Sequence, residues 1–187
     1  MVKQIRFLSS NPEKIKEINT ILKDDGIEVI SNNTKLEELQ TNDVRHLVKD
    51  KALKAFKKIG RPLIVEHTGL YIDKINGLPG GLTQIFWDTL QADKFAELFG
   101  APDDSAKATA RTTVCYVDGK NFQFFEGEIC GSIVDVPRGD RVFQWDCVFV
   151  PEGSKLTFSE MGTKEKNKIS MRKIALQQFA EYLNKTK

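Results

Sequence analysis

The stretch from Val65 to Gly81 constrains the fold of this chain most strongly. An apolar segment runs directly into the polar residues Glu66-His67-Thr68, and a second extended piece then leads to the corner Gly77-Leu78-Pro79-Gly80-Gly81. This pattern predicts a buried strand that enters a polar turn. Acidic and imidazole side chains at the end of an apolar strand are held rigidly at the rim of the core, where clefts for chemistry or binding lie. We therefore expect a functional site around Glu66 and His67.

Length and charge limit the class of protein and of partner. At 187 residues the chain is long enough for one domain with a substantial core, and we expect residues 1–187 to form a single domain. The net charge of +2 is too small for nucleic acid or an anionic membrane to be the main partner, so a small polyanion fits better. No apolar run approaches the roughly 20 residues that cross a bilayer, and the first residues lack the apolar segment of a secretory signal. This predicts a cytoplasmic protein.

The three cysteines are odd in number, widely spaced and set in apolar, strand-like contexts: Cys115, Cys130 and Cys147. This pattern favours buried reduced thiols over a metal site or a catalytic role. We assign them no chemistry.

Apolar periodicity predicts strands that alternate with helices first and follow one another later. Helices are expected from Pro12 onward and over residues 43–59, 83–99 and 164–183. Strands are expected over residues 5–8, 27–30, 62–65, 112–117, 122–125, 129–134 and 147–150. An Asp-Gly turn at residues 118–119 joins two of them. This order favours an α/β fold with a mixed sheet, and two lobes around a cleft would bring the distant polar turns together.

The polar turn after the first strand is a candidate anion site. Ser9-Ser10-Asn11-Pro12 supplies a helix cap and a first-turn proline, and Lys14 follows one turn into the helix. The free amide hydrogens of a helix N-terminus, together with a lysine, suit phosphate oxygens. The same residues also describe an ordinary capped helix with a solvated lysine, and this stretch alone favours that interpretation.

Two further segments contain site-like residues. Phe143-Gln144-Trp145-Asp146 could hold a planar ring between two aromatic side chains and bind its edge, although such a pattern alone is more often core packing. Lys166, Ser170 and Arg172 lie in the early turns of the expected closing helix, where a ligand at its N-terminus would meet them.

Four motifs, in the same order and covering nearly the whole chain, resemble the inosine triphosphate pyrophosphatase (ITPase) family. Residues 9–14 are similar to its Ser/Thr-x-Asn-x-x-Lys turn, and residues 65–80 to its Glu-Asp-Thr/Ser-Gly-Leu and Gly-Leu-Pro-Gly segment. Residues 143–146 are similar to its Phe-Gly-Trp/Tyr-Asp, and residues 157–172 to its closing motif, which ends in Glu-Lys-Asn-x-Ile-Ser-His-Arg. The four together are far more specific than any one of them.

The resemblance implies an ITPase-like twisted, mixed sheet with a nucleotide-binding cleft between two lobes, usually in a homodimer. It implies cleavage of ITP, dITP or XTP to the monophosphate and pyrophosphate with magnesium. The implied nucleotide ligands are Ser9, Asn11, Lys14, Lys51, Phe143, Trp145, Asp146, Lys166, Ser170 and Arg172. Glu38 and Glu66 would bind magnesium, and Glu66 would also act in catalysis. A 6-keto purine offers an acceptor where adenine offers an amino donor, so cationic donors at that edge would reject adenine.

Three positions depart from the family pattern. His67 stands where the family has aspartate, Gln84 where a lysine or arginine is common, and Met171 where a histidine precedes Arg172. A neutral imidazole is a poor magnesium ligand, although it can act as a base, and glutamine cannot offset the charge of phosphoryl transfer. Binding groups are retained while hydrolytic groups are replaced.

Three functional hypotheses follow. In the first, which we favour, the protein binds deaminated purine nucleoside triphosphates, hydrolyses them slowly or not at all, and signals the bound state to an effector protein. A prokaryotic stress or anti-phage assembly is one setting for such a sensor. In the second, it is an active pyrophosphatase in which Glu38 and Glu66 hold the metal and His67 assists the attacking water. In the third, it is a scaffold that binds no nucleotide.

Overall fold

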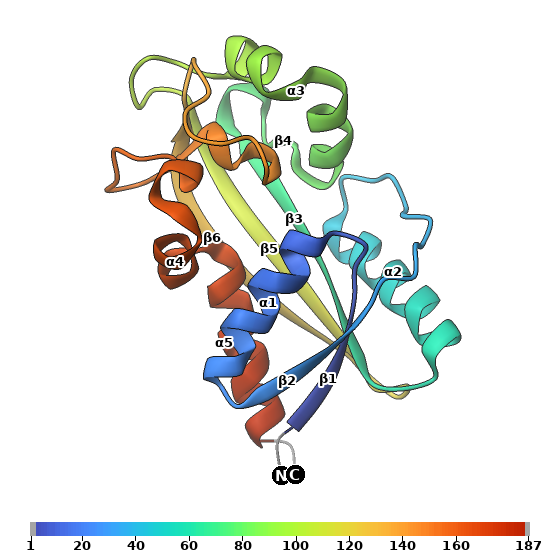
Figure 1. Cartoon of the computed structure of the whole chain (residues 1–187). Helices are drawn as coiled ribbons and strands as arrows, with labels where there is room; N and C mark the ends of the chain where they lie inside the picture. The colour runs from blue at the N-terminus through green and yellow to red at the C-terminus, as the bar shows by residue number, and fades with distance from the viewer. Residues whose placement is uncertain (1–2, 186–187) are drawn as a thin grey trace.

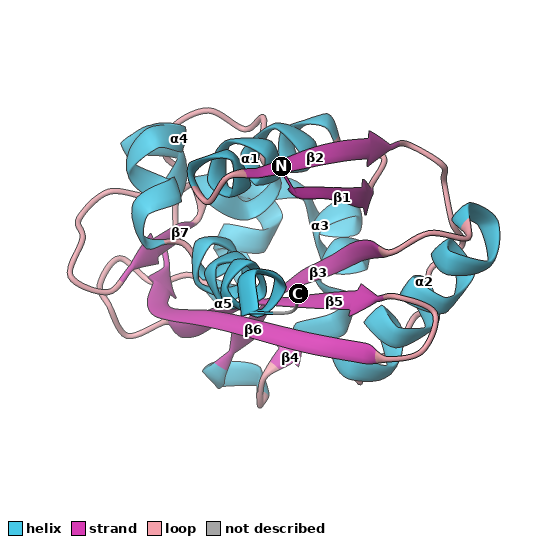
Figure 2. Cartoon of the chain, turned by 90° about the horizontal axis from the view of Figure 1, so that it is seen from below, coloured by secondary structure: helices cyan, strands magenta, loops and turns pink. Residues whose placement is uncertain are grey.

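A mixed seven-stranded sheet with helices on both faces forms the body of the molecule (Figure 1, Figure 2). The computed structural model describes residues 3–185. The strands are β1 (Lys3–Leu8), β2 (Ile27–Asn32), β3 (Leu63–Ile72), β4 (Leu78–Pro79), β5 (Lys107–Val117), β6 (Phe122–Ile133) and β7 (Phe149–Pro151). The helices are α1 (Pro12–Asp24), α2 (Val44–Ile59), α3 (Thr83–Phe99), α4 (Phe158–Ile169) and α5 (Met171–Lys185), with 3-10 turns η1 (Asp73–Ile75), η2 (Gly80–Leu82) and η3 (Gln144–Cys147).

The sheet order is β2-β1-β3-β5-β6-β7, and β4 pairs with β3 away from this path. β1 is parallel to β2 and β3, whereas the remaining pairs are antiparallel. The predicted α/β fold with a mixed sheet is therefore confirmed. No helix between residues 3 and 185 is long and apolar enough to cross a bilayer.

Alternate residues of β3 and β5 supply two separate cores, because successive strand side chains point to opposite faces. Ile64 and Val114 pack with α1 and α5 on one face, whereas Val65 and Cys115 pack with α2 on the other. A third core lies among α3, η3, β7 and α4 around the far end of β3, which contributes Leu70 and Ile72. Side chains at alternate positions of β3 therefore face α1 and α5 on one side of the sheet and α2 on the other.

At the predicted site, β3 is no longer paired with β1. β1 pairs with β3 at only two positions, Arg6 with Leu63 and Phe7 with Ile64, whereas β3 pairs with β5 along all ten of its residues. β3 therefore continues past the end of β1, beside the loop and helix that follow β1. Glu66 and His67 lie in this segment.

Local signals placed several element ends correctly. Asp43 caps α2 through a bond from the His46 N–H, and Gly60 ends it in a left-handed conformation. The predicted turn at Asp118 is also confirmed, because its carboxylate accepts from two following backbone N–H groups.

Other expectations were wrong. The polar turn after Val65 is part of the continuous strand β3, because β5 supplies hydrogen-bonding partners through this stretch. The expected helix over residues 164–183 is two helices that meet at Ser170, and the expected strand over residues 147–150 is divided between η3 and β7. Residues 122–134, expected as two pieces, are essentially the single strand β6.

Side-chain burial also differs from expectation at five positions. In the helices expected over residues 83–99 and 164–183, apolar spacing predicts that four side chains face the core, but the structure exposes them: Ile85, Leu98, Ile169 and Ile174. The break at Ser170 and the kink of α3 at Gln91 interrupt the regular helical faces that the periodicity assumed. Cys130 is exposed, unlike Cys115 and Cys147, because it lies on the outer face of β6.

Candidate active site

The loop after β1 and the start of α1 form the first wall of the site. Asn11 caps α1: its Oδ1 accepts from the Lys14 N–H at 3.1 Å. Ser9 Oγ accepts from the Asn11 N–H at 3.2 Å. The two polar side chains therefore shape the turn, as a capped helix predicts, and the Lys14 side chain is directed toward β3.

Glu66 lies at the centre of a buried ion-pair network. Its Oε1 lies 2.7 Å from Lys14 Nζ, and its Oε2 lies 3.3 Å from an Arg172 nitrogen and accepts from the Thr68 hydroxyl at 2.7 Å. Arg172 is 1% exposed and Glu66 2%. Both carboxylate oxygens of Glu66 are thus already engaged.

The network continues from Arg172 toward η3. Arg172 Nη1 lies 2.6 Å from Glu17 Oε2, Lys166 Nζ lies 3.6 Å from the same oxygen, and Lys166 Nζ donates to Asp146 Oδ2 at 2.7 Å. Residues from α1, β3, η3, α4 and α5 therefore meet in one polar cluster. A buried cluster of this kind contributes little net stability when complete, but loss of one partner costs several kcal/mol.

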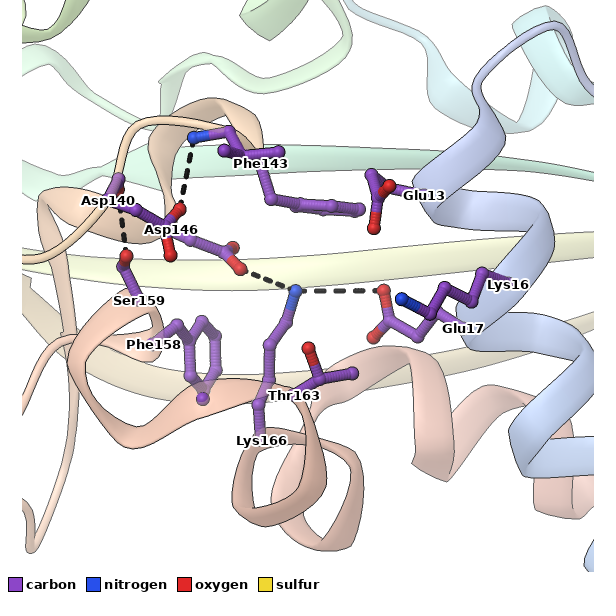
Figure 3. A pocket seen from close by; sticks show the side chains of 12 residues that line it. Glu13, Lys16, Glu17, Asp140, Phe143, Asp146, Phe158, Ser159, Thr163 and Lys166 are labelled. Atoms are coloured by element: carbon purple, nitrogen blue, oxygen red, sulfur yellow. Dashed lines mark hydrogen bonds and ion pairs between the residues drawn. The ribbon is translucent and has the colours of Figure 1, made fainter.

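A cavity of about 180 Å³ lies over the η3 end of this network, between α1 and α4 (Figure 3). Phe143 covers it, with its ring centroid 3.9 Å from Lys166 Nζ. Figure 3 shows Lys166 bonded to Asp146 on one side and Glu17 on the other. This volume is below the roughly 300–1,000 Å³ of pockets that enclose a whole ligand, so it would take one planar ring system and leave the rest outside.

Two carboxylate oxygens at this wall are buried and have no hydrogen-bond partner among residues 3–185: Glu17 Oε1 and Asp146 Oδ1. We refer to them as the open acceptors. Buried polar atoms in folded proteins are almost always paired, so such exceptions point to a ligand or water that completes them. Lys166 lies between the same two carboxyl groups and pairs with their other oxygens, Glu17 Oε2 and Asp146 Oδ2.

The structure separates the two aromatic residues that the sequence placed together. Phe143 lines the cavity, whereas Trp145 is 2% exposed and packs against Phe149 and Phe158 in the third core. The core-packing interpretation therefore holds for Trp145. Its chain neighbour Asp146 nevertheless reaches the cavity, because the tight turn η3 directs the two side chains differently.

Ser170 and Met171 lie behind the site. Ser170 Oγ accepts from the Lys173 N–H, so it caps the start of α5, and both residues are fully buried. Neither lines the cavity. The cap sets the direction of α5 and so places Arg172 in the network.

His67 follows Glu66 in β3 and therefore points to the opposite face of the sheet, where α2 lies. On that side Lys51 Nζ lies 2.5 Å from Glu38 Oε1 and 3.3 Å from the Glu66 carbonyl oxygen. His67 is buried, with 7% of its surface exposed. Within the described chain its Nε2 has no hydrogen-bond partner. His67, Lys51 and Glu38 thus form a second, smaller polar group beside Glu66.

Burial and neighbouring charges set the protonation states. The pKa of His67 is lowered to about 4, mainly by burial. The charge of Lys14 also lowers this pKa, by more than the charge of Glu66 raises it, so the imidazole is neutral at pH 7. Burial alone would raise the pKa of Glu66, but Lys14 and Arg172 outweigh it and hold that pKa well below its usual range. Burial raises the pKa of Asp146 to about 6, with Lys166 acting against this shift.

Gln84 lies away from the network. It begins the exposed side of α3, where its Nε2 donates to Asp88 at 2.7 Å and its Oε1 accepts from Gln144. Gln84 is therefore a neutral residue that is hydrogen-bonded to Gln144 of η3.

The sequence missed two members of the network, Glu17 and Thr68. Glu17 lies three residues after Lys14 on the buried side of α1, and helical spacing could have placed it beside Lys14. Thr68 shares a face with Glu66, but this follows only once β3 is known to be continuous.

Comparison with known proteins decides the family. The Ham1 family model matches residues 5–182. The chain belongs to the Ham1 family. It is 36% identical to a dITP/XTP pyrophosphatase of Methanopyrus kandleri, covering 96% of this chain and 95% of that protein. It is also 36% identical to an inosine triphosphate pyrophosphatase of Saccharomyces cerevisiae, with coverage of 96% and 95%.

Solved Ham1 structures have the same fold. A HAM1 protein from Coxiella burnetii superposes with a TM-score of 0.82 at 26% identity, covering 98% of this chain and all of that one. The Ham1 protein of Staphylococcus aureus superposes with a TM-score of 0.73 at 20% identity. The resemblance to the ITPase family that the four motifs indicated is confirmed.

Pyrophosphatases of the Ham1 family generally depend on a metal ion, which needs oxygen or nitrogen donors from the protein. Within residues 3–185, no group of three or more His, Cys, Asp or Glu side chains is arranged to hold a metal. Lys51 engages one oxygen of Glu38, and Lys14 and Arg172 engage both of Glu66. The residues therefore do not fit a metal held by the protein alone; magnesium in nucleotide sites is commonly held by one or two carboxylates together with phosphate oxygens.

Proposed function

We propose that this Ham1-family protein binds the triphosphates of deaminated purine nucleosides, such as dITP, ITP and XTP, and hydrolyses them slowly or not at all. The base would enter the cavity beneath Phe143, and the phosphates would extend toward Asn11 and Lys14 at the start of α1. The observation that carries this proposal is the polar wall of the cavity, where the Lys166 ammonium lies between the carboxyl groups of Glu17 and Asp146 and each carboxyl group has one open acceptor.

That wall matches the edge of a 6-keto purine. Hypoxanthine and xanthine present an acceptor at O6 and an N–H donor at N1, so Lys166 would donate to O6 and an open acceptor, on Glu17 or Asp146, would accept from N1. Adenine presents a donor at position 6 and an acceptor at N1, which reverses both pairings. Each buried group left unpaired costs about 1–3 kcal/mol, so the wall would reject adenine strongly.

The phosphate end would use the cations near Glu66. A triphosphate suits the free N–H groups of a helix N-terminus and the ammonium groups of Lys14 and Lys51. In the ligand-free protein Lys14 is paired with Glu66 and Lys51 with Glu38, so the phosphates would draw these ammonium groups away from the carboxylates. Magnesium that arrives with the nucleotide would then be held by Glu38 and Glu66, where it would neutralise phosphate charge.

Hydrolysis is the impaired step in this proposal, because His67 occupies the position where family members have a carboxylate. A neutral imidazole adds no negative charge for a metal ion. Loss of one positioned catalytic group commonly lowers a rate on the order of 10²–10³-fold. A nucleotide that is not hydrolysed can hold the protein in one conformation. The proposal therefore includes a role as a sensor that signals the bound state to an effector protein. It also includes a homodimer.

One observation favours the second function, an active pyrophosphatase. The His67 imidazole is neutral and its Nε2 has no partner within residues 3–185, so it can accept a proton from an attacking water. The substitution His67→Asp separates the two functions. If it creates activity, the natural protein is an impaired enzyme; if it removes activity, His67 is a catalytic base.

Thermal unfolding with added nucleotide tests binding itself. ITP and dITP should raise the midpoint, since a ligand at 100 times its Kd stabilises by about 2.7 kcal/mol, whereas ATP at the same concentration should not. Lys166→Met should abolish the response to ITP while the protein stays folded by circular dichroism. Equal responses to ITP and ATP, or no response to either, would overturn the proposal.

A further inference from the structure

Residues 138–146, here called the strap, form part of the cavity wall. The strap contributes Asp140, Phe143 and Asp146 to the cavity wall. At its start, the Arg138 N–H donates to the Cys147 carbonyl oxygen, and the Arg138 carbonyl oxygen accepts from the Thr157 hydroxyl. The strap therefore leaves and re-enters the core at fixed points, and its middle carries the residues that would contact a base.

Two side chains tie the strap to α3. Arg141 makes a bidentate ion pair with Asp93, with both nitrogen–oxygen distances 2.7 Å. Gln144 Nε2 donates to Gln84 Oε1, and Gln84 is itself oriented by its bond to Asp88. Along the chain, Gln144 stands between Phe143, which covers the cavity, and Asp146, which carries an open acceptor.

Gln144 has a backbone conformation that glycine tolerates far better. Its φ is +43°, in the left-handed region that non-glycine residues rarely adopt. Such strain persists only where surrounding contacts hold it, and it concentrates at functional segments. The motif that this segment resembles has glycine here, so this chain accepts the strain and gains a side chain that reaches Gln84.

We propose that Gln84 and Gln144 are positioning residues for the base pocket, whose contact holds the strap against α3 and so keeps Phe143 and Asp146 over the cavity. The contact would slow release of a bound nucleotide, and this second part rests on the proposed function. Because Gln84 and Gln144 do not line the cavity, they would act only through the strap.

The alternative is that the contact is an incidental surface bond. Gln84 is exposed and Gln144 is half-buried, and hydrogen bonds of this kind contribute modestly. A positioning role predicts a local effect on the strap and an effect on release rather than on association. An incidental bond predicts neither.

Amide hydrogen exchange of the nucleotide-free protein gives the first test. Gln84→Ala should speed exchange in residues 139–146 several-fold and leave β3 and β5 unchanged. Lys94→Ala is the matched control, because it removes an exposed ion pair to Glu97 on the same helix without touching the strap. Unchanged exchange in the strap of Gln84→Ala, or the same change in Lys94→Ala, would overturn the proposal. This measurement does not depend on nucleotide binding.

Stopped-flow measurement of ITP binding gives the second test. Gln84→Ala and Gln144→Gly should each raise the dissociation rate about 2–10-fold, with association within about twofold of wild type, because one hydrogen bond is worth roughly that factor. The double variant should dissociate no faster than the faster single variant, since both substitutions remove one contact. Additive effects, or unchanged dissociation, would overturn the role in retention. If wild type binds no ITP, the proposed function fails and hydrogen exchange alone decides the positioning role.

Discussion

The ammonium group of Lys14 lies 2.7 Å from Oε1 of Glu66, and this ion pair joins the first turn of α1 to the part of β3 that extends past β1. The helix that would receive the phosphates is thereby linked to the carboxylate that would share a metal ion with them. Through Arg172 and Glu17 the same network reaches the base pocket. Both ends of the proposed nucleotide site belong to one set of buried charges.

Lys14 should act on the phosphates rather than on the base. Lys14→Gln is expected to weaken dITP binding by about two orders of magnitude, because a charge-assisted contact to the triphosphate is lost. Binding of the nucleoside inosine should change by less than about threefold. Isothermal titration of both ligands checks this, and equal losses for the two would show that Lys14 supports the whole site.

Arg172 should be the most sensitive position for stability. Arg172→Ala leaves Glu17 and Glu66 buried without their shared cation, and we expect a loss of about 3–5 kcal/mol in the free energy of unfolding. Lys168→Ala, which removes an exposed ion pair with Glu165, should cost less than about 1 kcal/mol. Urea unfolding measures both. Similar losses in the two variants would contradict the assignment of a buried, interdependent network.

Phe143 and Trp145 should separate binding from stability. Phe143→Ala removes the ring over the cavity and should weaken ITP binding by about 1–3 kcal/mol, the usual value of one aromatic–base stack, with little effect on unfolding. Trp145→Ala empties part of the third core and should lower the free energy of unfolding by about 3–5 kcal/mol. If Phe143→Ala unfolded as readily as Trp145→Ala, the cavity would not be where we place the base.

His67 should make stability depend on pH. Burial lowers its folded pKa to about 4 from an ordinary 6.5, so the unfolded chain binds the proton first as the pH falls. The stabilisation from keeping His67 neutral is therefore present above about pH 6.5 and is lost as the pH falls toward 4. Between pH 7.5 and 5.0 this group alone should cost about 2 kcal/mol.

Comparison with His67→Gln isolates that contribution. The variant should lose about 2 kcal/mol less than wild type between those two pH values, measured by urea unfolding in the presence of EDTA. The raised pKa of Asp146, about 6 in the folded protein, has the opposite effect: the folded state binds this proton more tightly, so Asp146 adds stability as the pH falls. Wild type and variant share this effect, so it cancels in the comparison. Identical pH profiles for wild type and variant would contradict a buried, neutral His67.

The sequence predicted what depends on neighbours along the chain. The helix expected over residues 43–59 matches α2 because its caps, Asp43 and Gly60, act locally, and the Asn11 cap was found for the same reason. The family motifs then named most of the charged network, including Lys14 and Arg172. What they could not state is which of these groups face one another.

The errors came from distant contacts. The chain at Glu66 was expected to turn because its residues are polar, but β5 supplies the ladder that keeps it extended. Trp145 was expected beside a base, but it is buried in the third core, where it packs against Phe149 of β7 and Phe158 of α4. The break at Ser170 was missed because its cap hydroxyl replaces a helical bond that periodicity assumes. That the whole chain is one domain and lies in the cytoplasm stays a prediction.

The central claim is that the site holds a deaminated purine nucleoside triphosphate without cutting it efficiently. The most direct measurement is the release of pyrophosphate from dITP with magnesium, followed for the purified protein beside the dITP/XTP pyrophosphatase of Methanopyrus kandleri and for His67→Asp. We expect wild type to turn over at least about 100-fold more slowly than the relative while intact dITP is recovered from the protein by chromatography. Turnover within tenfold of the relative would contradict the claim.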